Sequence, residues 1–276
     1  MVARGSSPDA SGCTKNSIWL NVCRNKVADG LLERIMDPNK INQNHTNICG
    51  IAAFVRDWAQ DDPAGYAWLG ISLYEAGWGR IGRGSKLGQK VQPSPSLKNS
   101  PIPFFDHGNG RGTEMNHADW VVLASVREAL NDVFGYSAAD LLEPLEGLTT
   151  PGEVVKAFKA AGYTSVIEKT SWASGEGFDN IKEASNLHAT GWRVALLINE
   201  RMLHDDLIDT QASVATANHW VGLQTTIDLQ LAGRDYIVSP FLVFTWGQVK
   251  RVPERLANIP FPAFLKNYYG FVAAKY

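Results

Sequence analysis

A thiol and an imidazole are the two groups in this sequence best suited to attack a carbonyl. Cys49 stands in NQNHTNICGIAAF, behind amide and hydroxyl side chains and before apolar residues spaced at 51, 54, 55 and 58 as on one helix face. In the first turn of a helix, the dipole and a nearby imidazolium lower the pKa of a thiol. Cys49 is therefore a candidate nucleophile, although a lone cysteine is more commonly a small buried hydrophobic residue.

The neighbours of Cys49 fit the same chemistry. Gly50 brings no side chain that would crowd a substrate, and the amide of Gln43 could donate a hydrogen bond to an oxyanion. Thr46 or Asn47 is predicted to cap the N-terminus of the helix. These residues would form one small site if a base lay opposite the thiol.

His219 is the candidate base. Of the six histidines it alone begins a strongly apolar strand, in NHWVGL. A histidine at a strand end is held rigidly, as a base facing a helix N-terminus must be. The alternative is a half-buried histidine with its hydrogen bonds satisfied.

Local patterns predict the helices that would position these groups. Asp62 is a good N-cap, Pro63 suits the first helical position and Gly77 can end the helix, which gives a helical hairpin with the Cys49 helix. Residues 77–103 are predicted to form a long exposed loop. Further helices are expected in HADWVVLASVREALN and, from the capping box TTPGE, in TTPGEVVKAFKAAG. Asp57, Asp61 and Glu75 are interpreted as surface charges.

The last third of the chain is dense in β-branched and aromatic residues. Strands are predicted at 192–199, 219–227 and 234–246, with a turn at Ala232-Gly233 between the latter two. Helices first and sheet second predict an α+β fold, with helices against one side of an antiparallel sheet.

The composition limits the classes of partner. The chain has 276 residues, 45% hydrophobic and 20% charged, and a formal net charge of -2 without a basic stripe, so we expect no nucleic-acid partner. No segment approaches ~18 consecutive apolar residues, which predicts no membrane span. Residues 1–16 are small and polar, are expected to be flexible, and lack the apolar region of a classical signal peptide.

The cysteines point to a free thiol. Cys13, Cys23 and Cys49 cannot all pair with one another, so at least one is unpaired. Their spacing matches neither a zinc-ligand pattern nor a disulfide framework. We expect no metal and no other cofactor.

The order of these residues resembles the papain-like cysteine peptidase superfamily. The shared features are N-x(4)-C-G-x-A-A-F on a helix with Gln43 six residues before Cys49, then H-W-V at His219, then T-W-G at 245–247. The segments 49–82 and 118–131, and the closing TWGQVKR with FLKNYYGFVAA, also resemble bacterial effector-like toxins of this superfamily. The resemblance implies a single papain-like domain over 17–276, helical over about 17–190 and β-rich over about 191–276.

The third catalytic residue is left open. Phe244 stands where papain carries the asparagine that orients the histidine. Pairing of the two strands about Ala232-Gly233 places Thr245 near His219, so Thr245 or Gln248 could orient the ring. Asp235 has the spacing of the papain asparagine but would lie at the far end of that hairpin. Otherwise the site works as a dyad.

The resemblance implies acyl transfer through Cys49, His219 and Gln43. The substrate would be a peptide bond, a glutamine side chain or a peptidoglycan cross-bridge, and a cognate immunity protein would be a partner of such a toxin. The location would be secreted without a classical signal peptide, through a specialised system, or cytoplasmic. Two alternatives remain: a papain-like binding module without catalysis, and a transglutaminase-like acyl transferase.

Overall fold

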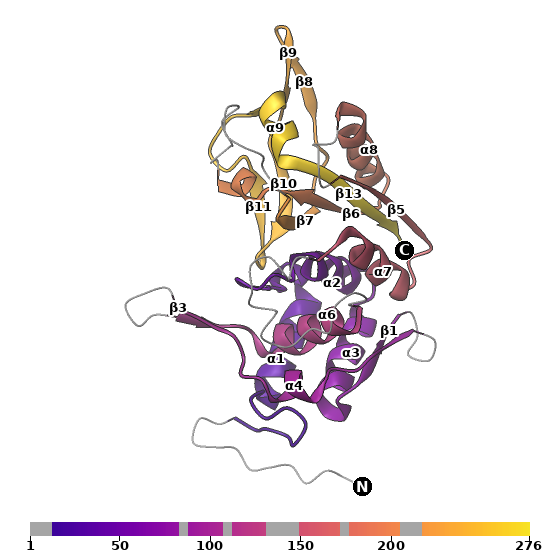
Figure 1. Ribbon diagram of the computed structural model, residues 1–276, viewed down its shortest axis with the longest axis vertical. Coiled ribbons are helices and arrows are strands. Elements are labelled where there is room, and N and C mark those ends of the chain that lie inside the picture. The colour runs from indigo at the N-terminus through magenta and orange to yellow at the C-terminus, as the bar shows by residue number, and fades with distance from the viewer. Residues whose placement is uncertain (1–12, 83–87, 107–111, 131–148, 172–176, 205–216) are drawn as a thin grey trace.

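The computed structural model describes residues 13–82, 88–106, 112–130, 149–171, 177–204 and 217–276. It has a helical part, lower in Figure 1, and a β-rich part above it. The α+β prediction is confirmed, and every strand pairing among the described residues is antiparallel.

The helical part is built around one buried helix. Its helices are α1 (Arg24–Met36), η1 (Pro38–Lys40), α2 (Cys49–Asp61), α3 (Pro63–Ala76), α4 (Pro95–Asn99), α5 (His117–Asp119), the π-helical η2 (Trp120–Ala124), α6 (Ser125–Leu130) and α7 (Pro151–Ala160). Every residue of α2 from Cys49 to Ala59 is buried, because α3 and α7 cover the faces of the helix that do not pack against the sheet. A helix buried on all sides cannot shift without disturbing both parts of the molecule.

The local capping signals predicted two helices correctly. The Asp62 side chain accepts the Gly65 N–H at the start of α3, and Gly77 ends that helix with φ +72°. Thr150 and Glu153 form the predicted capping box of α7. These ends are fixed by residues only a few positions apart, so the sequence alone determines them.

The segment 77–103 differs from the predicted exposed loop. It contains β1 (Gly79–Ile81), β2 (Gln89–Val91) and α4, and part of it lies outside the described residues. Ile81, Val91 and Leu97 are buried in the core of the helical part. A second ribbon, β3 (Phe104–Asp106) with β4 (Gly112–Glu114), projects to the left in Figure 1.

A disulfide joins Cys13 to Cys23, with a Cα–Cα distance of 5.2 Å, and leaves Cys49 as the free thiol. The sequence spacing did not predict this pairing. The bridge and the hydrogen bond from Asn16 Nδ2 to Tyr74 O fasten the described end of the segment 1–16 to the helical part. Residues 1–12 of that segment lie outside the described residues.

The β-rich part contains a six-stranded sheet in the order β11-β10-β7-β6-β13-β5 and a three-stranded sheet in the order β12-β9-β8. The elements are β5 (Ser165–Thr170), α8 (Phe178–Ala189), β6 (Arg193–Ile198), η4 (Glu200–His204), β7 (His219–Leu223), β8 (Leu229–Ala232), β9 (Asp235–Val238), β10 (Phe241–Thr245), β11 (Gln248–Val252), β12 (Ile259–Pro260), α9 (Phe261–Asn267) and β13 (Tyr268–Lys275). β5 and α8 belong to this part although they precede residue 191, the expected boundary.

Helices cover both faces of the six-stranded sheet, not one as expected. Ala195, Leu197 and Trp220 belong to the core with α2 and α7, whereas Leu196 and Val221 belong to the core with α8 and α9. Successive strand residues point to opposite faces, so strands buried on both sides need two layers of helix. The sheet therefore lies between α2 and α7 of the helical part on one face and α8 and α9 of the β-rich part on the other.

Candidate active site

Cys49 is the first residue of α2, as the sequence predicted, but its N-cap is Ile48 and no side chain caps the helix. The hydroxyl of Thr46 instead donates to the carbonyl of Gln43 at 2.6 Å, in the turn before the helix. Neither Thr46 nor Asn47 is thus the cap. Without a capping side chain, the first amides of α2 are left to other acceptors.

The Cys49 thiol faces the backbone of β7. The Trp220 N–H donates to Cys49 Sγ at 3.4 Å, and the amides of Gly50 and Cys49 itself also favour the thiolate. Burial nevertheless has the largest effect, and it raises the pKa of Cys49 to about 11. The side chain is only 3% exposed, so at neutral pH the sulfur is a thiol.

Gly50 has a packing role that the sequence did not reveal. A Cβ atom on this residue would lie 2.7 Å from Thr149 Cβ and 3.0 Å from Val154 Cγ2. The glycine thus allows α2 to approach the start of α7. It was expected to leave space for a substrate, but the structure places it against the protein core.

His219 begins β7 and is held by two contacts. Its Nε2 lies 2.7 Å from Thr245 Oγ1, and its ring stacks on Trp246 with centroids 4.7 Å apart. Burial lowers the pKa of His219 to about 3, with smaller contributions from the charges of His204 and Lys250. The imidazole is 4% exposed and is neutral at physiological pH.

The strand register explains why Thr245 meets His219. β7 and β10 are adjacent, with Phe244 opposite Gly222, so the end of β10 lies beside the start of β7. Of the three candidate orienting residues, Thr245 is in contact with the ring. Gln248 is exposed on β11, and Asp235 is exposed on β9 in the other sheet.

Trp246 and Gly247 form the tight turn between β10 and β11. Their φ values are +47° and +73°, both in the left-handed region, which suits a two-residue hairpin. For a tryptophan this conformation is strained, and such strain concentrates at functional sites. The turn holds the indole against the His219 ring.

Gln43 lies in a loop that touches this turn. A Cβ on Gly247 would lie 2.9 Å from Asn42 Cβ, so the two backbones are close. Gln43 is 3% exposed, and its side-chain amide makes no hydrogen bond with any other described residue. A buried amide of this kind retains its donors for a ligand.

Asp119 fixes the position of the Gln43 loop, which the sequence did not indicate. Its Oδ2 accepts the Asn42 N–H at 3.0 Å, and the Arg34 guanidinium binds both carboxylate oxygens at 2.8 and 2.7 Å. Arg34 comes from α1 and Asp119 from α5, so no local signal could have paired them.

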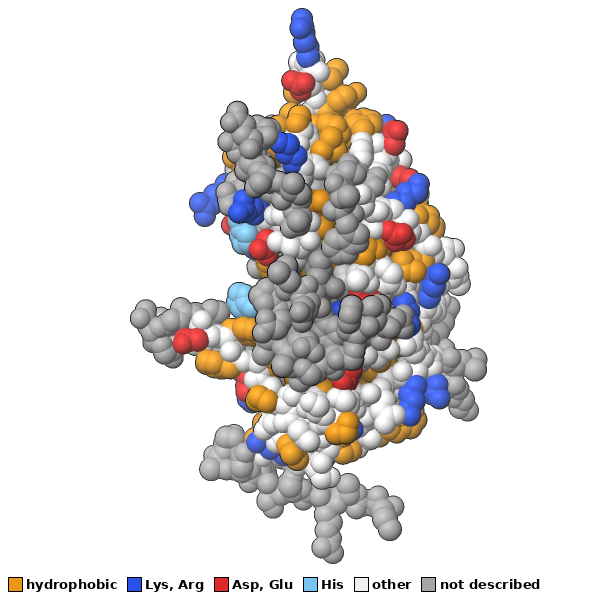
Figure 2. Space-filling model, viewed as in Figure 1, with side chains coloured by type: hydrophobic (Ala, Val, Ile, Leu, Met, Phe, Trp, Pro, Cys, Tyr) orange, Lys and Arg blue, Asp and Glu red, His pale blue; other side chains and the backbone are white. Residues whose placement is uncertain are grey.

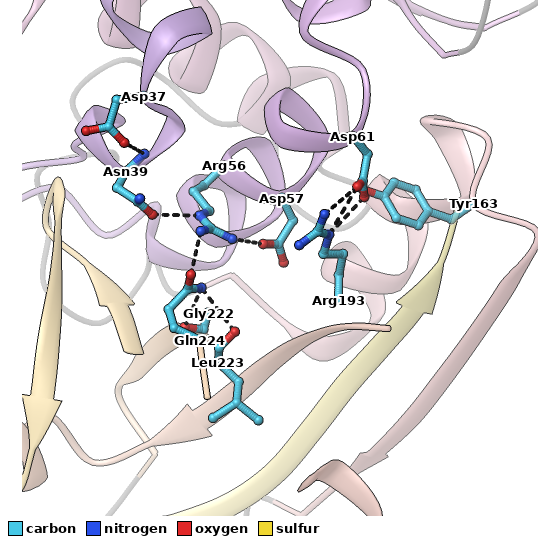
Figure 3. Close-up of polar contacts among 10 residues, drawn as sticks. All are labelled: Asp37, Asn39, Arg56, Asp57, Asp61, Tyr163, Arg193, Gly222, Leu223 and Gln224. Atoms are coloured by element: carbon cyan, nitrogen blue, oxygen red, sulfur yellow. Dashed lines mark hydrogen bonds and ion pairs between the residues drawn. The ribbon is translucent and has the colours of Figure 1, made fainter. Parts of the chain in front are cut away.

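Asp57 and Asp61 are not surface charges. Asp57 is 2% exposed and accepts from Arg56 Nη1 at 2.9 Å, and Asp61 binds Arg193 and the Tyr163 hydroxyl (Figure 3). The polar sequence context did not reveal that the sheet covers this end of α2. Glu75, by contrast, forms an exposed pair with Arg24.

The side chains of Cys49 and His219 lie in different surroundings. Both belong to the described residues, and no hydrogen bond joins their side chains. The thiol packs with the core of α2, whereas the imidazole contacts Trp246, which packs against the other core and stacks on His204. The peptide link between His219 and Trp220 brings the two groups to the same end of β7.

In the space-filling view the molecular outline is hollowed between the β-rich part and the helical part (Figure 2). The projecting β3–β4 ribbon carries the exposed Phe104, and Phe105 beside it packs edge-on against His45 of the Gln43 loop. No group of three or more His, Cys, Asp or Glu side chains suited to a metal occurs among the described residues. Within the same ranges, none of the helices is long and apolar enough to cross a membrane.

Comparison with known proteins gives no assignment. No model of a protein family matches the sequence, and no curated protein sequence matches it.

Proposed function

We propose that this protein is a papain-like cysteine hydrolase of the bacterial effector or toxin type, which cleaves or deamidates an amide bond. The observation that carries the proposal is the position of Cys49 Sγ. The sulfur sits at the first turn of α2 against the backbone amide that follows His219, while Thr245 binds Nε2 of the same histidine. The proposal requires the nucleophile, the base and the orienting group, which are all carried near the same end of β7, to act on one carbonyl.

The chemistry would begin with a neutral pair. If Thr245 accepts the Nε2 hydrogen, Nδ1 of His219 is the nitrogen that takes the thiol proton, and the thiolate attacks the carbonyl. Gln43 and the Cys49 N–H would stabilise the oxyanion. The imidazolium then gives its proton to the leaving amine, and water releases the acyl group from the sulfur.

The resting geometry requires a closing movement of the two groups. Catalytic hydrogen bonds are often long or absent without substrate and form only in the complex. The Thr245 hydroxyl is uncharged, so it orients the imidazolium but stabilises it less than a carboxylate would. The proposal therefore assigns Thr245 an orienting role and leaves charge stabilisation to the oxyanion donors.

Alkylation by iodoacetamide tests the proposal directly. The chain has three cysteines and two of them are bridged, so every alkylated molecule reports on Cys49. We expect alkylation at neutral pH that is faster than that of free cysteine and that is lost in His219→Gln. With candidate protein targets and peptidoglycan, product masses then separate backbone cleavage, deamidation and amine incorporation.

A binding module without catalysis is the second candidate, and burial favours it. A pKa of about 11 for Cys49 is what a structural thiol would have. Under this alternative, alkylation is slower than that of free cysteine and does not depend on His219. The same experiment therefore decides between the two candidates.

A further inference from the structure

Arg56 occupies a special position on the helix that carries the thiol. It lies seven residues after Cys49, about two turns along the same face of α2. The residue is 5% exposed although its guanidinium is charged. A buried guanidinium is stable only where its donors are satisfied.

Its donors reach three parts of the chain, as Figure 3 shows. Nε donates to Asn39 Oδ1 at 3.0 Å, in η1 just before the Gln43 loop. Nη1 donates to Asp57 Oδ1 at 2.9 Å on α2, and Nη2 donates to Gln224 Oε1 at 2.5 Å, one residue beyond β7. The Gln224 amide in turn donates to the carbonyls of Gly222 and Leu223, so it is fixed to the strand.

Arg56 also contacts the strand that carries Thr245. Its guanidinium lies 5.7 Å from the centroid of the Phe244 ring, within cation–π range. Phe244 lies opposite Gly222 in the pairing of β10 with β7, so the ring is placed at the strand that follows His219. The residue that replaces the papain asparagine thus packs against Arg56 and precedes the residue that binds His219.

We propose that Arg56 is a positioning residue for the site, which sets the register of α2 and the Gln43 loop against the β7–β10 pair. One rigid guanidinium links the segments that carry the four groups of the proposed site. These segments are α2 with Cys49, the loop with Gln43, β7 with His219 and β10 with Thr245. The inference rests on the proposed function, because the register matters only if these groups react together.

A second arginine on the same interface provides a matched control. Arg193 on β6 binds Asp61 of α2 with Nε–O distances of 3.2 and 3.0 Å, so it also ties the helix to the sheet. It makes no hydrogen bond in the described ranges with η1, β7 or β10. Arg56→Met and Arg193→Met therefore each remove one ion pair of α2, but only Arg56→Met also removes contacts with η1 and with Gln224.

The experiment measures the iodoacetamide rate at Cys49 in the full chain at pH 7, with and without His219→Gln. We expect Arg56→Met to alkylate about tenfold more slowly than wild type. The double variant Arg56→Met/His219→Gln should be no slower than His219→Gln alone, because both changes remove the same assistance. Arg193→Met should stay within twofold of wild type on either background.

Arg56→Lys covers the case in which Arg56→Met does not fold. Lysine keeps the charge beside Asp57 but cannot span Asn39 and Gln224 at once, so the same rate loss is expected at closer to wild-type stability. Denaturant unfolding of each variant is measured in parallel.

Three outcomes would overturn the inference. The first is an Arg56→Lys alkylation rate within twofold of wild type. The second is a double variant, Arg56→Met/His219→Gln, whose fold-loss in alkylation rate equals the product of the losses in the two single variants. The third is an Arg193→Met variant that loses as much rate as Arg56→Met. If His219→Gln is alkylated as fast as wild type, the proposed function is wrong. The positioning role is then wrong as well, because it depends on that function.

Discussion

The two ends of α2 contact the sheet through different kinds of interaction. At its start, Cys49 contacts β7 through the backbone amide of Trp220, and the ring of the preceding residue, His219, is held by a hydroxyl and an indole. Toward its end, Arg56, Asp57 and Asp61 meet Gln224 and Arg193 through charged hydrogen bonds. The thiol and the imidazole at one end are neutral at neutral pH, whereas the contacts at the other end are ionic.

This difference shows how burial acts on titratable groups with and without partners. Burial disfavours the charged form, so it raises the pKa of the thiol and lowers that of the imidazole. Burial also raises the pKa of Asp57, but Arg56 and Arg193 oppose the shift. The ionic end can therefore hold the helix in register, while the thiol and the imidazole at the other end stay neutral at neutral pH.

The largest effect should come from removing the sulfur. Cys49→Ala is expected to lose all cysteine alkylation and at least about 10³-fold in hydrolysis, since the proposed mechanism has Cys49 as its nucleophile. Loss of one buried sulfur should cost only ~1 kcal/mol of unfolding free energy. Mass spectrometry and denaturant unfolding check both values. Hydrolysis or toxicity retained by a folded Cys49→Ala protein would exclude this mechanism.

His219→Gln should lower hydrolysis by about 10²- to 10⁴-fold, the usual contribution of a general base. Glutamine keeps a polar group near Thr245 but cannot accept the thiol proton and carry it as a cation. Steady-state rates on any identified substrate measure the loss. A variant as active as wild type would assign the base role elsewhere.

Acid should destabilise the protein through His219. The pKa is about 3 when folded and near 6.5 when unfolded, so the unfolded chain binds the extra proton. The stabilising contribution is complete above pH 6.5 and is lost as pH falls toward 3, to the order of a few kcal/mol. Unfolding free energies at pH 7 and pH 4.5 should differ more for wild type than for His219→Gln. An equal difference in both proteins would contradict the assignment.

Thr245→Val should lower hydrolysis about tenfold, because the ring loses its hydrogen bond but keeps its stack on Trp246. Thr245→Ser, which retains the hydroxyl, is the control and should stay near wild type. If the valine and serine variants are equally active, the hydroxyl does not orient His219.

The smallest effect is expected at the ionic end. Arg193→Met removes a partly exposed pair with Asp61, which after solvent screening should contribute ~1 kcal/mol to the unfolding free energy. Denaturant unfolding gives the value. A loss above about 3 kcal/mol would mean that this pair, and not Arg56, dominates the interface.

Features encoded within a few residues were predictable from the sequence. The caps of α3 and α7 follow from adjacent side chains. The α+β order of elements was predictable for the same reason. The approach of Thr245 to His219 was expected from one continuous hairpin about Ala232-Gly233, but the structure divides that hairpin into β7–β10 and β8–β9 in two different sheets. The catalytic roles of Cys49, Gln43 and His219 remain predictions.

Features that depend on distant packing were not predictable. Asp57 has the sequence context of a surface residue and is buried only because the sheet docks on α2. Thr46 could have capped the helix, but its hydroxyl instead donates to the carbonyl of Gln43 in the preceding turn. Arg56 carried a usable signal, because a residue seven positions after Cys49 must share its helix face.

The Cys13–Cys23 bridge makes the fold sensitive to its redox surroundings. Closing so short a loop contributes about 3 kcal/mol by restricting the unfolded chain. Disulfides persist in oxidising compartments and are reduced in the cytosol, so transfer between the two would loosen the entry to α1. The same chain thus carries a disulfide whose covalent state follows its compartment and, separate from it, the free thiol of Cys49.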